Sequence, residues 1–182
     1  VSIDNNDDQA ECYREWTIPS GIILISNNNR SLVDACNNAA KIATGDCFLV
    51  LSDDFLTPPR WNELLKEKID RDMYGILVND GISNGDIMSL PIMSKSLYER
   101  IGYIYHPDYK YLYCDTEQTE VCIALEKFAV SPMCIIRHQW LPGEHPESDE
   151  LHKMHESGES YQRDLKVFNE RKQNNFYIEQ LV

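Results

Sequence analysis

The stretch Gly45-Asp46-Cys47-Phe48-Leu49-Val50-Leu51-Ser52-Asp53-Asp54 decides the fold class of this chain. Residues 47–51 form a continuous apolar run, which is typical of a strand that is covered on both faces. Two adjacent carboxylates follow at the C-terminal end of this strand, and burying them is costly unless a cation neutralises them. Oxygen ligands suit Mg²⁺ or Mn²⁺, so the pair indicates a divalent-metal site. A solvated turn before the next helix would explain the same two residues.

The segments around this stretch alternate between strand and helix. Apolar runs predict strands, and caps, glycines and 3.6-residue periodicity predict helices. The alternation predicts an α/β class: a three-layer α/β/α sandwich with a mostly parallel, Rossmann-like sheet. In such sheets the ligand site lies at the C-terminal ends of the strands. The expected strands are 1–4, 21–26, 47–51, 74–78, 87–93 and 130–136, and the expected helices are 31–44, 57–69, 94–101, 116–128 and a polar stretch beyond 142.

Length and charge limit the function classes. The chain has 182 residues and a formal net charge of −13, which suits about one domain. This acid excess argues against nucleic acid and against an anionic membrane surface as partners. It allows a phosphate-bearing small molecule if a divalent cation lies between phosphate and carboxylates.

The cysteines and the apolar segments bear on the cellular location of the protein. The chain has 6 cysteines, none in a CxxC pair, and most lie in apolar runs, which favours reduced core thiols. No segment reaches the roughly 18 apolar residues of a membrane span. The first residues lack the basic front and apolar stretch of a signal peptide. These features together predict a cytoplasmic protein.

Four motifs in order resemble the family-two glycosyltransferases of the GT-A fold. Residues 37–58 (NNAAKIATGDCFLVLSDDFLTP) look like the family's nucleotide-sugar half, in which an acidic DxD-like motif ends an apolar strand. Residues 1–8 (VSIDNNDD) are similar to its second strand. Residues 97–102 (LYERIG) and 113–117 (YCDTE) resemble its acceptor-side stretch. The resemblance covers about residues 1–140.

The resemblance implies a GT-A-type fold and a metal-dependent glycosyltransferase. Such an enzyme moves a sugar from a nucleotide-diphosphate sugar, here expected to be a UDP-sugar, to a saccharide or other hydroxyl acceptor with inversion. It implies Mn²⁺ or Mg²⁺ as the cofactor. Residues 1–140 would form the nucleotide-sugar-binding and catalytic domain, and 141–182 a polar, acidic, helical C-terminal extension. The acidic charge from Glu144 to Asp164 is expected only to keep the protein soluble.

The resemblance also assigns catalytic and metal-binding roles. Asp115 matches the catalytic base, which takes the proton of the acceptor hydroxyl, and Glu117 is the reserve candidate. Asp115 would equally cap a helix beginning at Thr116. Asp54 matches a metal ligand, and His138 matches an additional one, although a histidine that serves only as a hydrogen-bonding group is an equal alternative.

Four further residues match the nucleotide side of the family. Asp4 matches the strand-end acid that binds the base, and Asp53 would lean toward the ribose. Asn37 opens the matching motif. Lys41 could approach a phosphate, and a solvated surface lysine is the alternative.

One departure from the family concerns the N-terminus. The family's first strand, with its nucleotide-gripping turn, should precede Asp4, and nothing precedes it in this sequence, so the domain is expected to be N-terminally incomplete. Another subunit of a homo-oligomer could supply the missing wall. The rival interpretations are an inactive nucleotide-binding module of the same fold and a sugar-phosphate nucleotidylyltransferase-like protein. The latter needs a glycine-rich loop with arginine near the start, which is absent here.

Overall fold

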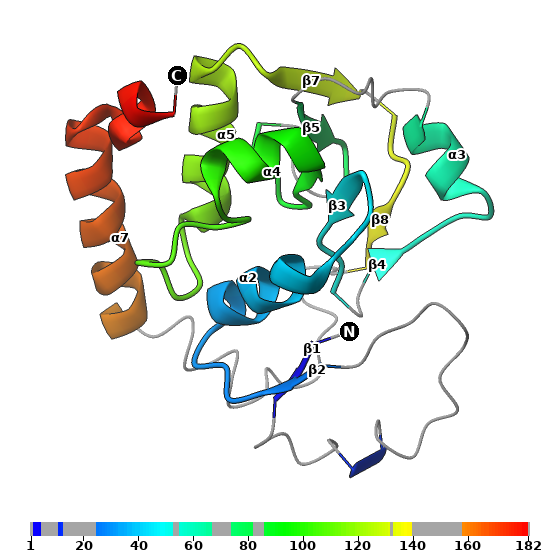
Figure 1. Cartoon of the computed structure of the whole chain (residues 1–182), viewed down its shortest axis with the longest axis horizontal. Coiled ribbons are helices and arrows are strands. Elements are labelled where there is room, and N and C mark those ends of the chain that lie inside the picture. The colour runs from blue at the N-terminus through cyan, green and yellow to red at the C-terminus, as the bar shows by residue number, and fades with distance from the viewer. Residues whose placement is uncertain are drawn as a thin grey trace.

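A computed structural model describes residues 2–4, 11–12, 25–52, 55–66, 74–81, 86–131, 133–139 and 158–181. Asp53 and Asp54 lie outside the described residues, and so do the side chains of the first two strands. Helices and strands alternate along the chain (Figure 1). In order they are β1 (Ser2–Asp4), β2 (Ile25–Asn27), α2 (Leu32–Ile42), β3 (Cys47–Leu49), β4 (Phe55–Leu56), α3 (Trp61–Lys66), β5 (Gly75–Val78), β6 (Ile92–Ser94), α4 (Lys95–Ile101), α5 (Cys114–Ala124), β7 (Phe128–Ser131), β8 (Arg137–His138), α7 (Gly158–Gln173) and the 3-10 helix η1 (Asn175–Gln180).

The central sheet has the strand order β3-β6-β5-β7. β5 and β7 pair in parallel, whereas β6 is antiparallel to both of its neighbours, so β3, β5 and β7 all run in one direction. This agrees with the expected α/β class, with β6 as the reversed strand in a mixed sheet. The carboxyl ends of β3 and β5 therefore meet the beginning of β6 at one edge. Two smaller sheets pair β1 with β2 in parallel and β4 with β8 in antiparallel fashion.

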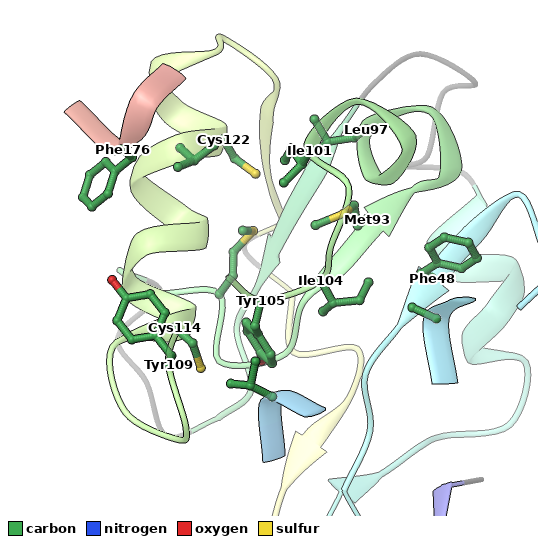
Figure 2. Packing of buried hydrophobic residues seen from close by; sticks show 14 of the residues in the cluster. Phe48, Met93, Leu97, Ile101, Ile104, Tyr105, Tyr109, Cys114, Cys122 and Phe176 are labelled. Carbon is green, nitrogen blue, oxygen red and sulfur yellow. The ribbon is translucent and has the colours of Figure 1, made fainter. Parts of the chain in front are cut away.

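Two apolar clusters cover the two faces of the central sheet. Successive side chains of a strand point to opposite faces, so Leu77 joins one cluster and its neighbours Ile76 and Val78 join the other. The first cluster contains core residues of α2, α4 and α5, and Figure 2 shows side chains of these elements meeting there. The second contains Leu65 of α3 and Ile136. The sheet is thus enclosed on both sides, as a three-layer sandwich requires.

Local signals define two of the helices. The Ser31 hydroxyl accepts a hydrogen bond from the Asp34 amide at 3.1 Å and begins α2. Ser94 does the same for α4, and Gly102 ends that helix at φ +90°, a conformation that favours glycine. Both starts agree with the sequence-based prediction.

The boundaries of several elements differ from the prediction. α3 begins at Trp61 and not at residue 57, and β6 spans Ile92–Ser94 and not 87–93. α2 ends at Ile42 and does not reach Gly45. α5 begins at Cys114 because Tyr113 takes a left-handed φ of +63°, a turn that the sequence does not signal. It ends at Ala124, and Phe128, which was expected to be helical, begins β7.

The C-terminal segment 158–181 belongs to the same core. α7 lies beside α5 (Figure 1), and Phe168, Phe176 and Ile178 are buried in the first apolar cluster. The interpretation that the acidic charge from Glu144 to Asp164 only keeps the protein soluble is wrong at Asp164, which is 0% exposed. In the part of the chain that the structure describes, no helix has both the length and the apolar character needed to cross a bilayer.

Candidate functional site

Polar side chains gather at the sheet edge where β3 and β5 end and β6 begins. The ladder continues past β3, where the Val50 amide donates to the Pro91 carbonyl at 3.1 Å. Asp80, two residues after β5, is only 1% exposed, and the Ser89 hydroxyl donates to its carboxylate at 2.7 Å. Neither Asp80 nor Ser89 was predicted as a site residue. The available signal was Asn79-Asp80-Gly81, a polar turn at the end of an apolar strand.

His138 lies at this edge. Its backbone amide donates to the Asp80 carbonyl at 2.8 Å, and its Nδ1 is 3.9 Å from the Asp80 carboxylate. In the β4–β8 pair it is the partner of Phe55, on which its ring stacks at 4.5 Å with an interplanar angle of 9°. Because Phe55 directly follows Asp53 and Asp54 in the chain, this pairing brings His138 beside the segment that carries the predicted acidic pair.

The predicted metal ligands are Asp54 and His138, and the structure describes only His138. Asp54 lies outside the described residues, so its distance to His138 is not defined. Among the residues that the structure does describe, no three His, Cys, Asp or Glu side chains are grouped as a metal site would require. A carboxylate and an imidazole are both metal ligands in proteins, and the Asp80 carboxylate lies 3.9 Å from Nδ1 of His138.

Asp115 lies in the first turn of α5. One of its carboxylate oxygens, Oδ1, accepts a hydrogen bond from the Thr116 amide at 2.7 Å. Within the described part of the chain, no hydrogen bond involves the other oxygen. Burial raises the pKa of this carboxyl, and the hydrogen bonds from Thr116 oppose the rise without cancelling it. Asp115 is not the helix cap, since Tyr113 holds that position.

Hydrogen bonds connect the Asp115 turn with the sheet edge. The Thr119 hydroxyl donates to the Asp115 carbonyl at 2.7 Å and accepts from the Met88 amide at 2.9 Å. Met88 is followed by Ser89, which binds Asp80. A polar path therefore runs from the backbone carbonyl of Asp115 through Thr119 to the Met88–Ser89 segment, and Ser89 binds Asp80.

Glu117, the reserve candidate, is committed to an ion pair. It is 2% exposed, and its two oxygens accept hydrogen bonds from Arg171 at 2.8–3.0 Å. The Tyr109 hydroxyl is a second partner, at 2.7 Å. A carboxylate held in this way has little capacity to accept a substrate proton.

Two other predicted nucleotide ligands, Asn37 and Lys41, form hydrogen bonds with other parts of the chain. The carboxamide of Asn37 binds the backbone of the loop after α4: it donates to the Tyr105 carbonyl at 2.7 Å and accepts from the Ile104 and Tyr105 amides. Lys41 is exposed and donates to Asn38 at 3.1 Å. Asp4 ends β1, where its backbone pairs with Asn27, and its side chain is outside the described residues.

Fold and site together define an α/β domain with a buried carboxylate, Asp80, just after one strand of its central sheet. The chain belongs to glycosyl transferase family 2, whose family model matches residues 2–140. This confirms the resemblance and the GT-A-type fold, and it supports glycosyl transfer from a nucleotide sugar. No curated protein and no solved structure matches the chain. α7 and η1 lie beyond the matched residues.

Proposed function

We propose that this domain is a metal-dependent inverting glycosyltransferase that uses Asp115 as its catalytic base. It would take a sugar from a UDP-sugar or a related donor and place it on a saccharide or another hydroxyl acceptor. Family membership supports the reaction class. The observation that carries the assignment of the base is the Asp115 carboxylate, which keeps one oxygen without a hydrogen-bond partner among the described residues. The backbone carbonyl of the same residue is linked through Thr119 to Met88, next to the sheet edge.

The chemistry of the step matches this carboxylate. Asp115 would take the proton of the acceptor hydroxyl while the acceptor oxygen forms a bond to the anomeric carbon. The bond between that carbon and the diphosphate oxygen breaks, and the diphosphate leaves with the electron pair. A raised pKa makes the ionised carboxylate a stronger base, so the burial that raises the pKa of Asp115 serves the proton transfer.

The donor side of the proposal rests on residues at the strand ends. Asp54 and His138 would hold Mn²⁺ or Mg²⁺, and Asp4 and Asp53 would contact the nucleoside. When bound, such a cation neutralises the charge that develops on the leaving diphosphate. The pairing of His138 with Phe55 supports this set, because Phe55 is the neighbour of Asp54 in the chain.

The base is tested by Asp115→Asn, which preserves shape and removes the proton acceptor. Loss of a general base lowers a rate by about 10²–10⁴-fold, so transfer should fall by that factor while UDP-sugar affinity is unchanged. The matched control is Asp108→Asn, which removes a 66% exposed carboxylate in the preceding loop and should leave the rate intact. Unchanged transfer in Asp115→Asn would exclude Asp115 as the base.

The metal set is tested by calorimetry with UDP in the presence and absence of Mn²⁺. Asp54→Ala should abolish the Mn²⁺-dependent part of UDP binding, and His138→Ala should weaken it. Asp46→Ala is the control, since Asp46 is an exposed carboxylate at the opposite end of the same strand. Equal Mn²⁺ dependence in Asp54→Ala and the control would contradict the metal assignment. Binding of UDP with no turnover of any donor would instead favour a binding module.

A further inference from the structure

One face of α7 carries two buried charged side chains. Tyr161, Asp164, Phe168 and Arg171 are spaced by 3, 4 and 3 residues, so they form a single stripe along the helix. Asp164 is 0% exposed and Arg171 is 8% exposed. Buried charges are retained in a fold only where partners satisfy them, and both side chains form hydrogen bonds with the segment 109–117, which carries Asp115.

Asp164 holds the backbone of the loop that leads into α5. Its carboxylate accepts hydrogen bonds from the amides of Tyr111 and Leu112, both at 2.9 Å, and from the Lys110 amide at 3.3 Å. Arg163 adds a charged contact at 3.0 Å. Burial by itself would raise the pKa of Asp164, but Arg163 and the amides outweigh it and the pKa is lowered. The carboxylate therefore acts as a charged clamp on three consecutive residues.

The aromatic members of the stripe hold the next residue, Tyr113. Its φ of +63° is a conformation that side-chain-bearing residues rarely adopt, and it directs the chain into the first turn of α5. The Tyr113 ring stacks on Phe168 at 5.3 Å between centroids and meets the edge of Tyr161 at 5.6 Å. α7 thus packs against the side chain of the strained residue itself.

Arg171 contacts α5 on the C-terminal side of Asp115. Its guanidinium binds both oxygens of Glu117, which lies two residues after Asp115 on α5. Glu117 also accepts from Tyr109, a fully buried residue that Figure 2 shows beside Cys114 at the start of the helix. Contacts from α7 therefore hold the chain both before and after Asp115.

We propose that α7 is a positioning element for the catalytic base, and that Asp164 is the positioning residue that sets the turn from which Asp115 projects. The inference rests on the proposed role of Asp115. It makes residues beyond the matched range 2–140 part of the catalytic apparatus. Asp164 contacts no substrate in this proposal; it acts through the backbone of residues 110–112.

The test is Asp164→Asn. It replaces one carboxylate oxygen, which accepts hydrogen bonds from backbone N–H groups of residues 110–112, with an NH2 group, which cannot accept them. A misplacement of a catalytic group by about 1 Å costs on the order of 10²-fold in rate, so kcat should fall by about 10- to 100-fold while donor KM is unchanged. Glu170→Gln is the matched control: it removes one exposed carboxylate from the same helix and should leave kcat unaltered. Phe168→Leu is the second variant, used if Asp164→Asn does not fold, and it should lower kcat in the same way.

Amide hydrogen exchange supplies a readout that needs no turnover. Asp164→Asn should lose protection at residues 110–112 and also at the Glu117 amide, which donates to the Tyr113 carbonyl at 2.9 Å in the first turn of α5. Loss confined to 110–112, or a normal kcat despite that loss, would overturn the inference. Turnover that survives Asp115→Asn would instead refute the proposed function, and the exchange data would still report whether α7 holds the turn.

Discussion

Replacing Arg171 by methionine would leave the Glu117 carboxylate buried without its cation. Glu117 is 2% exposed, and Arg171 supplies three of its hydrogen bonds, so the Tyr109 hydroxyl would remain as its partner. Removing one partner of a buried ion pair costs about 3–5 kcal/mol. In a chain of this size each kcal/mol lowers Tm by about 2–4 °C, so Arg171→Met should lower Tm by about 6–20 °C.

The neighbouring residue provides a matched control. Lys172 also pairs across to α5, with Glu120, and also lies over an aromatic ring, that of Phe168 at 5.2 Å. Its side chain is 52% exposed, against 10% for Arg171. An exposed pair contributes about 0–1 kcal/mol and an exposed cation–π contact about 0.5–1 kcal/mol, so Lys172→Met should cost at most about 2 kcal/mol.

Urea unfolding followed by circular dichroism measures these differences, with the m-value checked for each variant. The decisive comparison is the double variant Glu117→Gln with Arg171→Met. It removes the uncompensated charge and keeps an acceptor for Tyr109, so it should be more stable than Arg171→Met alone. A double variant that is less stable than the single one, or an Arg171→Met cost no larger than that of Lys172→Met, would refute the reasoning.

Three further outcomes are expected. The ionised form of Asp115 is the active base in the proposal, and burial raises the pKa of this carboxyl. The kcat/KM should therefore rise with pH along an acid limb whose midpoint lies above the usual aspartate pKa of about 3.9. A limb with its midpoint at that usual value would contradict the assignment. Gly75→Ala would place a Cβ 2.6 Å from the Cys122 Sγ and should lower the free energy of unfolding in urea by about 1–3 kcal/mol. Gly158→Ala is the control, because its Cβ would meet nothing within 4 Å. An unchanged free energy of unfolding for Gly75→Ala would show that the contact relaxes. Asn37→Ala loses three hydrogen bonds to the loop after α4 and should lower the free energy of unfolding by about 2–4 kcal/mol. UDP affinity, measured by calorimetry, should be unchanged. A loss of UDP affinity would show that Asn37 contacts the nucleotide.

The sequence predicts elements well where the signal is local. Ser94 and Gly102 define α4 because a hydroxyl cap and a left-handed glycine act within one turn of the helix. It predicts the start of α5 poorly, because the left-handed turn at Tyr113 depends on rings of α7 that lie about fifty residues further along the chain. Phe128 is assigned to the wrong element since an apolar residue fits the end of a helix and the start of a strand equally well.

The candidate site shows the same division. Asp115 is found from its motif, because the residues around it are contiguous in sequence. Asp80 and Ser89 are missed since they become neighbours only when the reversed strand β6 is placed beside β5. Glu117 resembles a catalytic acid in the motif, and its commitment to Arg171 becomes visible only when α7 is docked.

The docking of α7 also changes what counts as the catalytic unit. The family match ends at residue 140, and the polar, acidic character of the remainder predicts an extension whose charge only keeps the protein soluble. However, Asp164 and Arg171 are among the most deeply buried charged residues, and both bind the segment that carries the proposed base. An ion pair that served only solubility would be exposed, because desolvating two charges opposes folding unless their partners hold them in a defined geometry. The placement of these charges is therefore explained better by a positional role at Asp115 than by a general contribution to solubility.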